Sequence, residues 1–360
     1  MPTISVDTAI ESQLKKLSAR SRHLSFLLGA GASKACGLPT IGELVGLVKA
    51  DLPIADKVAS DYAFDASANL EEGLSRLRRL RTVLADGAEF AGIDVDAVER
   101  VDRAICVSIV KHLAVEGNVE PYRRLAAWLN GQQYLKPVEI FTVNYDLLLE
   151  QALEREKVHY FDGFVGAIHA AFRSDLVEIL DDPTRSLPPS CSRVWKLHGS
   201  LNWKVVGDGA DRRVVRTGMV ADDAIAIFPS EEKYEDSRRV PFVVLMDRLR
   251  HALQEPESFT IVCGYSFGDQ HLNEVLFDAA RLYPRSELWV LCHAALPDVV
   301  KTQAALYPNI VAHGSDEVIA GGREYKWLPP TAADAKYFNG NSCRLGDFEV
   351  LTQALLPEKP

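Results

Sequence analysis

A short apolar run ends in a glycine-rich turn at Phe26-Leu27-Leu28-Gly29-Ala30-Gly31-Ala32-Ser33. A chain leaving a buried strand must turn sharply here, and glycine lets a backbone approach a diphosphate closely. A helix after the turn would direct its free N–H groups and positive dipole end at such an anion. The turn therefore predicts a nucleotide-phosphate site, although Lys34 stands where a GxGxxG fingerprint has its third glycine.

The composition is that of a globular protein. The 360 residues are 47% hydrophobic and 25% charged, enough for a sizeable core. The net charge of −10 argues against direct nucleic-acid binding. Six scattered cysteines without a CxxC pair favour reduced thiols in the cytoplasm over disulfides. The basic segment before Leu24–Leu28 mimics a signal peptide, but its apolar core is too short, and we expect no membrane span.

Apolar runs of strand length alternate with helical patterns along most of the chain. Several runs are nearly continuous and do not alternate, as in strands that helices cover on both faces. The expected strands are Leu24–Leu28, Val138–Thr142, Val194–Leu197, Ala224–Phe228, Phe259–Cys263, Leu288–Cys292 and Ile310–Ala312. The expected helices are Ile41–Leu52, Tyr145–Glu156, Pro241–Gln254 and His271–Leu282. This order predicts an α/β fold with a doubly wound, Rossmann-like parallel sheet.

Residues 1–325 are expected to form one nucleotide-binding domain that carries two additions. Residues from about 53 to 134 show no convincing strand and predict a helical insertion. One of its helices has arginines mostly off the apolar face, which favours a solvated surface over an anion-docking site. These are Arg76, Arg78, Arg79 and Arg81. Residues from about 162 to 223 predict a small irregular subdomain with a β-hairpin near Arg212–Thr217. Residues 326–360 predict a C-terminal extension that packs on the domain or contacts a neighbour.

Four polar clusters each follow the end of an expected strand. They are Gly29–Ser33, Thr142–Asp146, Lys196–Ser200 and Gly264–Asp269. The carboxyl ends of parallel strands share one edge of a sheet, and ligands bind in the crevice there. We therefore expect these distant segments to converge on one site.

Each cluster also has a purely structural interpretation. Asn144 would cap a helix beginning near Tyr145, and Asp146 would complement the dipole of that helix. His198 would be a loop histidine. In the other clusters, Ser266 with Asp269 would form a capping box, and the glycines of the first turn would only make the turn tight.

Together and in this order, the four clusters resemble the motifs of the sirtuin-like NAD-binding family. The matching segments are GAGAS at 29–33, TVNYD at 142–146, KLHGS at 196–200 and GYSFGD at 264–269. The resemblance spans about residues 24–292. The longer segments GLPT, NYDLLLE, HGSLNW and GYSFGDQHLN resemble the branch found in bacterial antiphage defence, whose members typically destroy NAD. The resemblance implies an NAD glycohydrolase with NAD as its substrate.

The resemblance also implies roles for individual residues. Asn144 would orient the attacking water or the ribose, and Asp146 would support the hydrogen bonds on the ribose side. His198 would be the general base, a task that histidine can perform near neutral pH. The residues implied to bind the dinucleotide are Gly29, Ala30, Gly31, Ser33, Thr142, Gly264 and Ser266.

The chain departs from the protein deacylases of this family. It has no paired cysteines for their four-cysteine zinc ribbon, so we expect no zinc or other metal. It reads Leu38-Pro39-Thr40-Ile41-Gly42 where the deacylases carry Asp-Phe-Arg. These differences favour NAD hydrolysis. The alternatives are a deacylase or ADP-ribosyltransferase, or a sensor that binds NAD or ADP-ribose. A conventional dehydrogenase fits poorly, since the acidic residue expected about 20 residues onward falls in a helix-like stretch.

An NAD-consuming domain would be toxic if it were always active. The chain offers no obvious trigger-sensing domain, so we expect control by homo-oligomerisation or by a partner. The resemblance suggests an ATPase of the HerA type or an Argonaute protein as that partner, with the chain acting as a cytoplasmic effector of antiviral defence.

Overall fold

A computed structural model of the chain describes residues 2–64, 70–84, 88–115, 117–178, 188, 190–207, 211–218, 240–332 and 334–356. The strands of its main sheet are β1 (Thr3–Ile4), β2 (Leu24–Leu28), β3 (Glu139–Thr142), β4 (Tyr160–Phe161), β7 (Ser192–Lys196), β10 (Phe259–Cys263), β11 (Glu287–Leu291), β12 (Ile310–His313), β13 (Glu317–Ala320) and β14 (Arg323–Trp327). The helices of the first half are α1 (Val6–Leu17), α2 (Ala30–Lys34), α3 (Ile41–Asp51), η1 (Ile54–Asp56), α4 (Lys57–Ala63), α5 (Leu70–Val83), α6 (Val95–Leu113), α7 (Glu120–Asn130), α8 (Leu148–Arg155) and α9 (Ser174–Glu178). Those of the second half are α11 (Phe242–Gln254), α12 (Gln270–Leu282), α13 (Asp298–Leu306), η4 (Ala335–Tyr337) and α14 (Phe348–Leu355).

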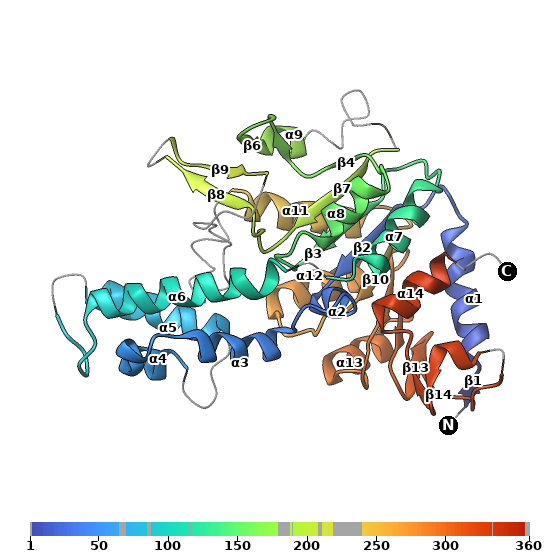
Figure 1. The fold of residues 1–360 in the computed structure, drawn as a ribbon. Coiled ribbons are helices and arrows are strands. Elements are labelled where there is room, and N and C mark those ends of the chain that lie inside the picture. The colour runs from blue at the N-terminus through green and yellow to red at the C-terminus, as the bar shows by residue number, and fades with distance from the viewer. Residues whose placement is uncertain are drawn as a thin grey trace.

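Six parallel strands at the centre of the main sheet have the Rossmann arrangement (Figure 1). Across the sheet they run β7-β3-β2-β10-β11-β12, which is the order 3-2-1-4-5-6 when the six are renumbered along the chain. The predicted doubly wound α/β fold is therefore confirmed. The sheet also continues through β13, which is antiparallel to both β12 and β14, and through β14, which pairs with β1 in parallel. Neither β13 nor β14 was predicted.

Helices cover both faces of the sheet because successive side chains of each strand point in opposite directions. In β2, Phe26 and Leu28 belong to the core that includes α1, α7, α8 and α14. Leu27 belongs to the other core, which includes α11, α12 and α13. All five residues of β2 are buried. Its nearly continuous apolar run therefore reflects a strand between two helical layers.

Two of the predicted strands match the structure at both ends, whereas the start of one predicted helix is wrong. Leu24–Leu28 and Phe259–Cys263 are β2 and β10. The strand expected at Ala224–Phe228 lies outside the described residues. The helix expected from Tyr145 onward is wrong at its start, because α8 begins at Leu148. The glycine turn leads into α2, which has five residues and is separate from the longer α3.

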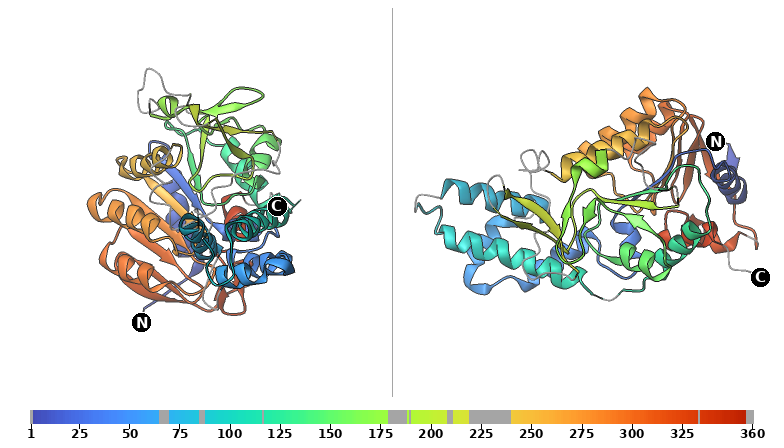
Figure 2. Two further views of the ribbon diagram at one scale, coloured as in Figure 1. Left: turned by 90° about the vertical axis from the view of Figure 1, so that its left-hand side faces the viewer. Right: turned by 90° about the horizontal axis from the view of Figure 1, so that it is seen from above.

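Helices α3 to α6 form a unit that extends away from the sheet (Figures 1 and 2). They share an apolar cluster of their own, which includes Val48, Leu74 and Ile105. Helix α7, further along the chain, instead packs against α8 and α14 on the main core.

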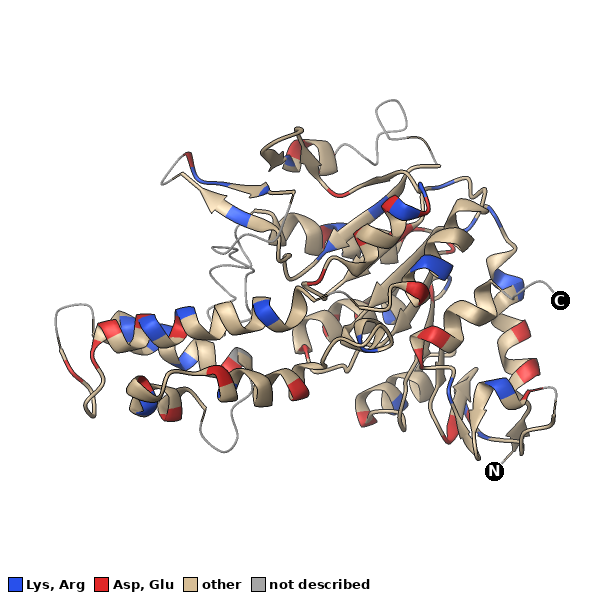
Figure 3. Ribbon diagram, viewed as in Figure 1, with Lys and Arg blue, Asp and Glu red and all other residues tan. Residues whose placement is uncertain are grey.

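Two arginines of α5 pair with acidic side chains. Both nitrogens of the Arg78 fork lie 3.2 Å from carboxylate oxygens of Asp102, and Arg76 lies 3.0 Å from Glu72. Figure 3 shows acidic and basic residues mixed along α5 and α6. This pairing favours the interpretation of a solvated helix face over that of a docking site for an anion.

A second, four-stranded sheet follows Asp162. Its strands are β5 (Phe164–Val165), β6 (Ala170–Phe172), β9 (Arg213–Arg216) and β8 (Trp203–Val206), in that spatial order. Strands β8 and β9 are antiparallel, as the predicted hairpin near Arg212–Thr217 requires.

The C-terminal residues pack on the main core. Strands β15 (Phe338–Asn339) and β16 (Ser342–Cys343) lead to Gly346. The backbone of Gly346 lies against Cys292, just past β11, so closely that an added Cβ would stand 2.1 Å from the carbonyl carbon of Cys292. The ring of Phe348 in α14 is buried, and its centroid lies 4.9 Å from that of Tyr122 in α7. Helix α14 is therefore part of the layer that covers one face of the sheet.

A buried ion network lies at the amino-terminal edge of the sheet, around Glu139 at the start of β3. The Glu139 carboxylate accepts hydrogen bonds from Arg248 at 2.6 and 2.8 Å and from Trp195 at 2.6 Å. His23 lies 3.0 Å from the same carboxylate. Burial alone would raise the pKa of Glu139, but Arg248 and His23 lower it below its usual range. This network lies at the other edge from the four polar clusters, so we assign it to stability.

Candidate functional site

The four polar clusters follow β2, β3, β7 and β10, the four neighbouring strands at the centre of the sheet. The strand order reverses between β2 and β10, where Leu28 pairs with Cys263. Ligands of open α/β sheets bind outside the carboxyl ends of the strands at this point of reversal. The structure thus places the four clusters at the expected edge of the sheet.

The glycine turn lies directly against the loop that follows β10. Gly29 N donates to Cys263 O at 3.0 Å, and Gly31 N donates to Gly264 O at 2.8 Å. A Cβ on Gly29 would stand 2.4 Å from Gly264 O, and a Cβ on Gly31 would stand 2.6 Å from Gly264 Cα. Both glycines are therefore required for the two loops to lie in contact, because a Cβ at either position would clash with Gly264. Gly264 itself has φ of +70°, which favours glycine further.

Asn144 joins the loop after β3 to the glycine turn. Its Nδ2 donates to Gly29 O and to Ser33 Oγ, both at 2.9 Å, and lies 3.3 Å from Tyr122 Oη. The Asn144 side chain is buried. Because α8 starts at Leu148, Asn144 caps no helix, and the capping interpretation of this residue is wrong.

Tyr122 is a residue of the site that the sequence did not indicate. Its hydroxyl lies 3.2 Å from Ser33 Oγ and beside Asn144. Burial raises the pKa of Tyr122 well above its usual value, and the charge of Asp146 raises it further. The phenol therefore stays protonated and serves as a fixed hydrogen-bonding group beneath the glycine turn.

Asp146 bonds to two segments of the chain at once. Its Oδ2 accepts a hydrogen bond from Ser33 Oγ at 2.6 Å, and its Oδ1 accepts one from Leu148 N at 3.1 Å. It therefore supports the first turn of α8 and the glycine turn together. Thr142 ties the same loops, since its Oγ1 donates to Leu28 O at 3.0 Å and accepts from Asn144 N at 3.1 Å.

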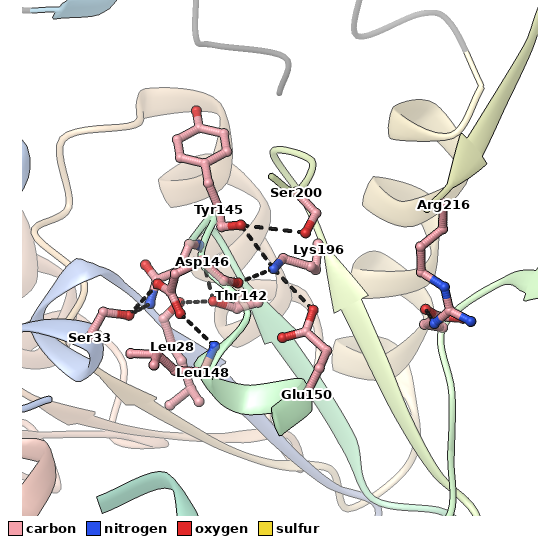
Figure 4. Close-up of polar contacts among 12 residues, drawn as sticks. Leu28, Ser33, Thr142, Tyr145, Asp146, Leu148, Glu150, Lys196, Ser200 and Arg216 are labelled. Atoms are coloured by element: carbon pink, nitrogen blue, oxygen red, sulfur yellow. Dashed lines mark hydrogen bonds and ion pairs between the residues drawn. The ribbon is translucent and has the colours of Figure 1, made fainter. Parts of the chain in front are cut away.

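Lys196 joins the loop after β3 to the end of β7 (Figure 4). The side chain is buried and lies 3.0 Å from a carboxylate oxygen of Glu150 in α8. Its Nζ also donates to the backbone carbonyls of Tyr145, at 3.2 Å, and Asp146. Leu201 N donates to the same Tyr145 carbonyl at 3.0 Å. One buried ammonium group thus fixes the backbone that carries Asn144 and Asp146.

His198 joins the loop after β7 to the loop after β10. Its Nε2 lies 3.3 Å from Oδ2 of Asp269, and the two side chains are 13% and 19% exposed. Asp269 is also the N-cap of α12, since its Oδ1 accepts from Leu272 N at 3.2 Å. Ser266 is exposed and does not begin the helix, so the capping box predicted for Ser266 is wrong.

These contacts close into a ring of four loops, which we call the four-loop ring. The glycine turn contacts the TVNYD loop through Asn144, and that loop contacts the KLHGS loop through Lys196. The KLHGS loop contacts the GYSFGD loop through His198, and the GYSFGD loop returns to the glycine turn through Gly264. The Trp195 and Trp203 rings near it are buried in the core.

Two further properties of the described residues bear on the chemistry. Within the described ranges, His, Cys, Asp and Glu side chains form no group of three that could hold a metal ion. Among the helices that the structure describes, none is both long enough and apolar enough to cross a membrane.

Comparison with known proteins finds one family model that is similar to this region. No curated protein matches the chain. Residues 138–307 match the family model of the SIR2-like domain, a family that uses NAD. The matched range begins at β3 and contains Asn144, Asp146, His198 and Asp269, while the glycine turn precedes it. Residues 138–307 of this chain are therefore similar to a SIR2-like domain.

Proposed function

We propose that the chain hydrolyses the bond between the nicotinamide and the ribose of NAD. Asn144 orients the water or the ribose, Asp146 supports the ribose-side hydrogen bonds, and His198 is the general base. The dinucleotide-binding residues in this proposal are Gly29, Ala30, Gly31, Ser33, Thr142, Gly264 and Ser266. The products are nicotinamide and ADP-ribose.

The protein contributes two things to this reaction: it positions the reactants, and it accepts one proton. The ring nitrogen of bound nicotinamide is cationic, and it leaves with the electron pair of the broken carbon–nitrogen bond. A water oxygen forms the new bond to the ribose carbon, and His198 accepts the proton that this water loses. The amide nitrogen of Asn144 is engaged beneath the glycine turn. Its side-chain oxygen is then the atom that holds the water or a ribose hydroxyl.

One side of the glycine turn is exposed, and a diphosphate could bind along that side. Ala30 and Gly31 are partly exposed, whereas Gly29 and Ser33 are buried. Because the amides of Gly29 and Gly31 already donate to carbonyls near β10, we assign close approach to the backbone at Ala30 and Gly31. Ser33 is buried and contributes indirectly, because its hydroxyl donates to Asp146 and so holds the glycine turn in place.

The four-loop ring is the observation that supports the proposal most strongly. It joins an imidazole and a carboxamide to a glycine turn at the strand-order reversal of the sheet. A protein that only bound NAD would need the turn, but it would not need a histidine paired with a carboxylate beside it.

We further propose that this activity serves bacterial antiphage defence and is restrained by homo-oligomerisation or a partner, such as a HerA-type ATPase or an Argonaute protein. The support is the resemblance of its four motifs to that branch. Assays of the chain with and without the products of neighbouring genes, together with its mass in solution, test this proposal. A fully active monomer that needs no partner would contradict it.

An NAD-cleavage assay with product analysis tests the reaction. Release of nicotinamide with free ADP-ribose indicates hydrolysis, an acylated ADP-ribose indicates deacylation, and binding without turnover indicates a sensor. His198→Ala should lower turnover by about 100- to 10,000-fold. The matched control is His159→Ala, an exposed histidine directly before β4 at the other edge of the sheet. A folded His198→Ala chain with normal turnover would remove His198 from the mechanism.

A further inference from the structure

We infer that Asp269 is a positioning residue for His198, holding Nε2–H of the imidazole and leaving Nδ1 as the basic nitrogen. The inference deepens the proposed function and rests on it for the consequence in catalysis. The observation that carries it is the distance of 3.3 Å between His198 Nε2 and Asp269 Oδ2.

The two oxygens of Asp269 are used differently. Oδ1 accepts from Leu272 N at 3.2 Å and so caps α12, which fixes the plane of the carboxylate. Oδ2 then faces the imidazole from the adjacent loop. A carboxylate can only accept from a ring nitrogen that carries hydrogen, so this contact selects the Nε2–H tautomer of neutral His198.

The loop that carries Asp269 is itself held firmly. Tyr265 Oη lies 3.0 Å from the backbone carbonyl of Asp269 and 2.9 Å from Oδ1 of Asn273. Nδ2 of Asn273 donates to the carbonyl of Phe267 at 2.8 Å, and Phe267 has φ of +59°. These bonds fix the turn between Gly264 and α12, so the carboxylate is presented to the histidine in one orientation.

The low exposure of both side chains strengthens the interaction between His198 and Asp269. At 13% and 19% exposure, solvent screens the pair less than it screens a pair on the open surface. A carboxylate that orients a histidine is a known way to fix its tautomer, and exchanging it for an amide can leave the wrong tautomer in place. A cap alone would use one oxygen and would not require the other to face an imidazole.

Asp269→Asn separates the two roles of the side chain. Asparagine caps a helix as well as aspartate does, so α12 should keep its start and the melting temperature should change little. The amide has no charge and can donate to the ring, so Nε2–H is no longer selected. The matched control is Asp94→Asn, which makes the same exchange at the cap of α6, where Asp94 accepts from Ala97 N.

The test is NMR of ¹⁵N-histidine-labelled chain without any ligand, above the pH at which histidine is charged. His198→Gln identifies the signals of His198 among the nine histidines. We expect protonated Nε2 in the wild type and in Asp94→Asn, and a population with protonated Nδ1 in Asp269→Asn. An unchanged tautomer in Asp269→Asn, or a wild-type ring protonated at Nδ1, would overturn the inference.

Kinetics supply the second readout. Asp269→Asn should lower kcat for NAD cleavage by at least about tenfold with a smaller change in KM, because it disturbs the base and not the binding surface. A tautomer change with kcat unaffected would overturn the catalytic part of the inference. If the tautomer changes but the wild-type chain cleaves no NAD under any condition, the pairing is supported and the proposed function fails.

Discussion

Replacing Gly29 with alanine should damage the site more than the fold. The added Cβ would stand 2.4 Å from Gly264 O and 2.6 Å from the Cα of Tyr265. Both are backbone atoms, which cannot rotate away as the end of a side chain can. The φ of Gly29 is −104°, which any residue adopts. Lack of space, and not backbone strain, therefore decides the outcome.

The cost in stability follows from the separation that the Cβ enforces. Moving Gly264 O from 2.4 Å to an ordinary contact near 3.4 Å requires the two loops to part by about 1 Å. The bonds from Gly29 N at 3.0 Å and Gly31 N at 2.8 Å would then be lost. At about 0.5–1.5 kcal/mol each, they sum to roughly 1–3 kcal/mol, the usual range for an overpacked site. For 360 residues this corresponds to a decrease of about 1–4 °C in Tm.

The cost in activity should be larger. Asn144 bonds to Gly29 O at 2.9 Å, so the same displacement moves a proposed catalytic group. A shift of about 1 Å can lower a rate by about 100-fold. Calorimetry and chromatographic measurement of nicotinamide release check the two effects separately.

Gly46→Ala in α3 is the control for this substitution. A Cβ at Gly46 would meet nothing within 4 Å, so alanine should stabilise the helix by about 0.5–1 kcal/mol without affecting cleavage. The reasoning would be refuted by a Gly29→Ala chain that keeps the wild-type Tm and the wild-type rate.

Three further predictions concern groups around and away from the site. Tyr122→Phe should cost about 0.5–1.5 kcal/mol in urea unfolding, because it removes the hydroxyl beside Asn144; an unchanged midpoint would contradict this. Glu139→Gln should cost about 3–5 kcal/mol at pH 7, because Arg248 keeps a buried charge without its counter-ion. Since the pKa of Glu139 is lowered, wild-type stability from this group is present above pH ~4.3 and is lost as pH falls through the folded pKa; the Gln variant should lack that part of the acid transition. Burial raises the pKa of all six cysteine thiols, and only Cys106 and Cys191 are partly exposed. Because the pKa of Cys106 is raised to about 12, a thiol reagent at pH 8 should modify Cys191 first; equal rates for all six would contradict this.

The sequence predicts the centre of the fold well because local pattern and topology agree there. The nearly continuous apolar runs that form β2 and β10 have no competing interpretation at helical spacing, and a glycine marks the end of each. Once these strands are parallel neighbours, the loops after them must meet. The convergence of Asn144, His198 and the glycine turn therefore follows from strand order, without information on side-chain contacts.

The sequence could not predict groups that act across tertiary contacts. Tyr122 lies in a stretch that predicts only helix, and its bond to Ser33 arises when α7 packs under the glycine turn. The start of α8 was misplaced because Asn144 is a good capping residue, but tertiary bonds to Gly29 hold its side chain elsewhere. The hairpin of β13 and β14 had a usable indication in Gly321-Gly322, whose φ values of +58° and +72° suit a two-residue turn.

The packing of α14 has a consequence for how the protein is made. Phe348 supports Tyr122, which in turn lies beside Asn144 under the glycine turn. Residues 348–355 leave the ribosome long after all four loops have emerged. A nascent chain therefore lacks the packing behind Asn144 until this helix docks.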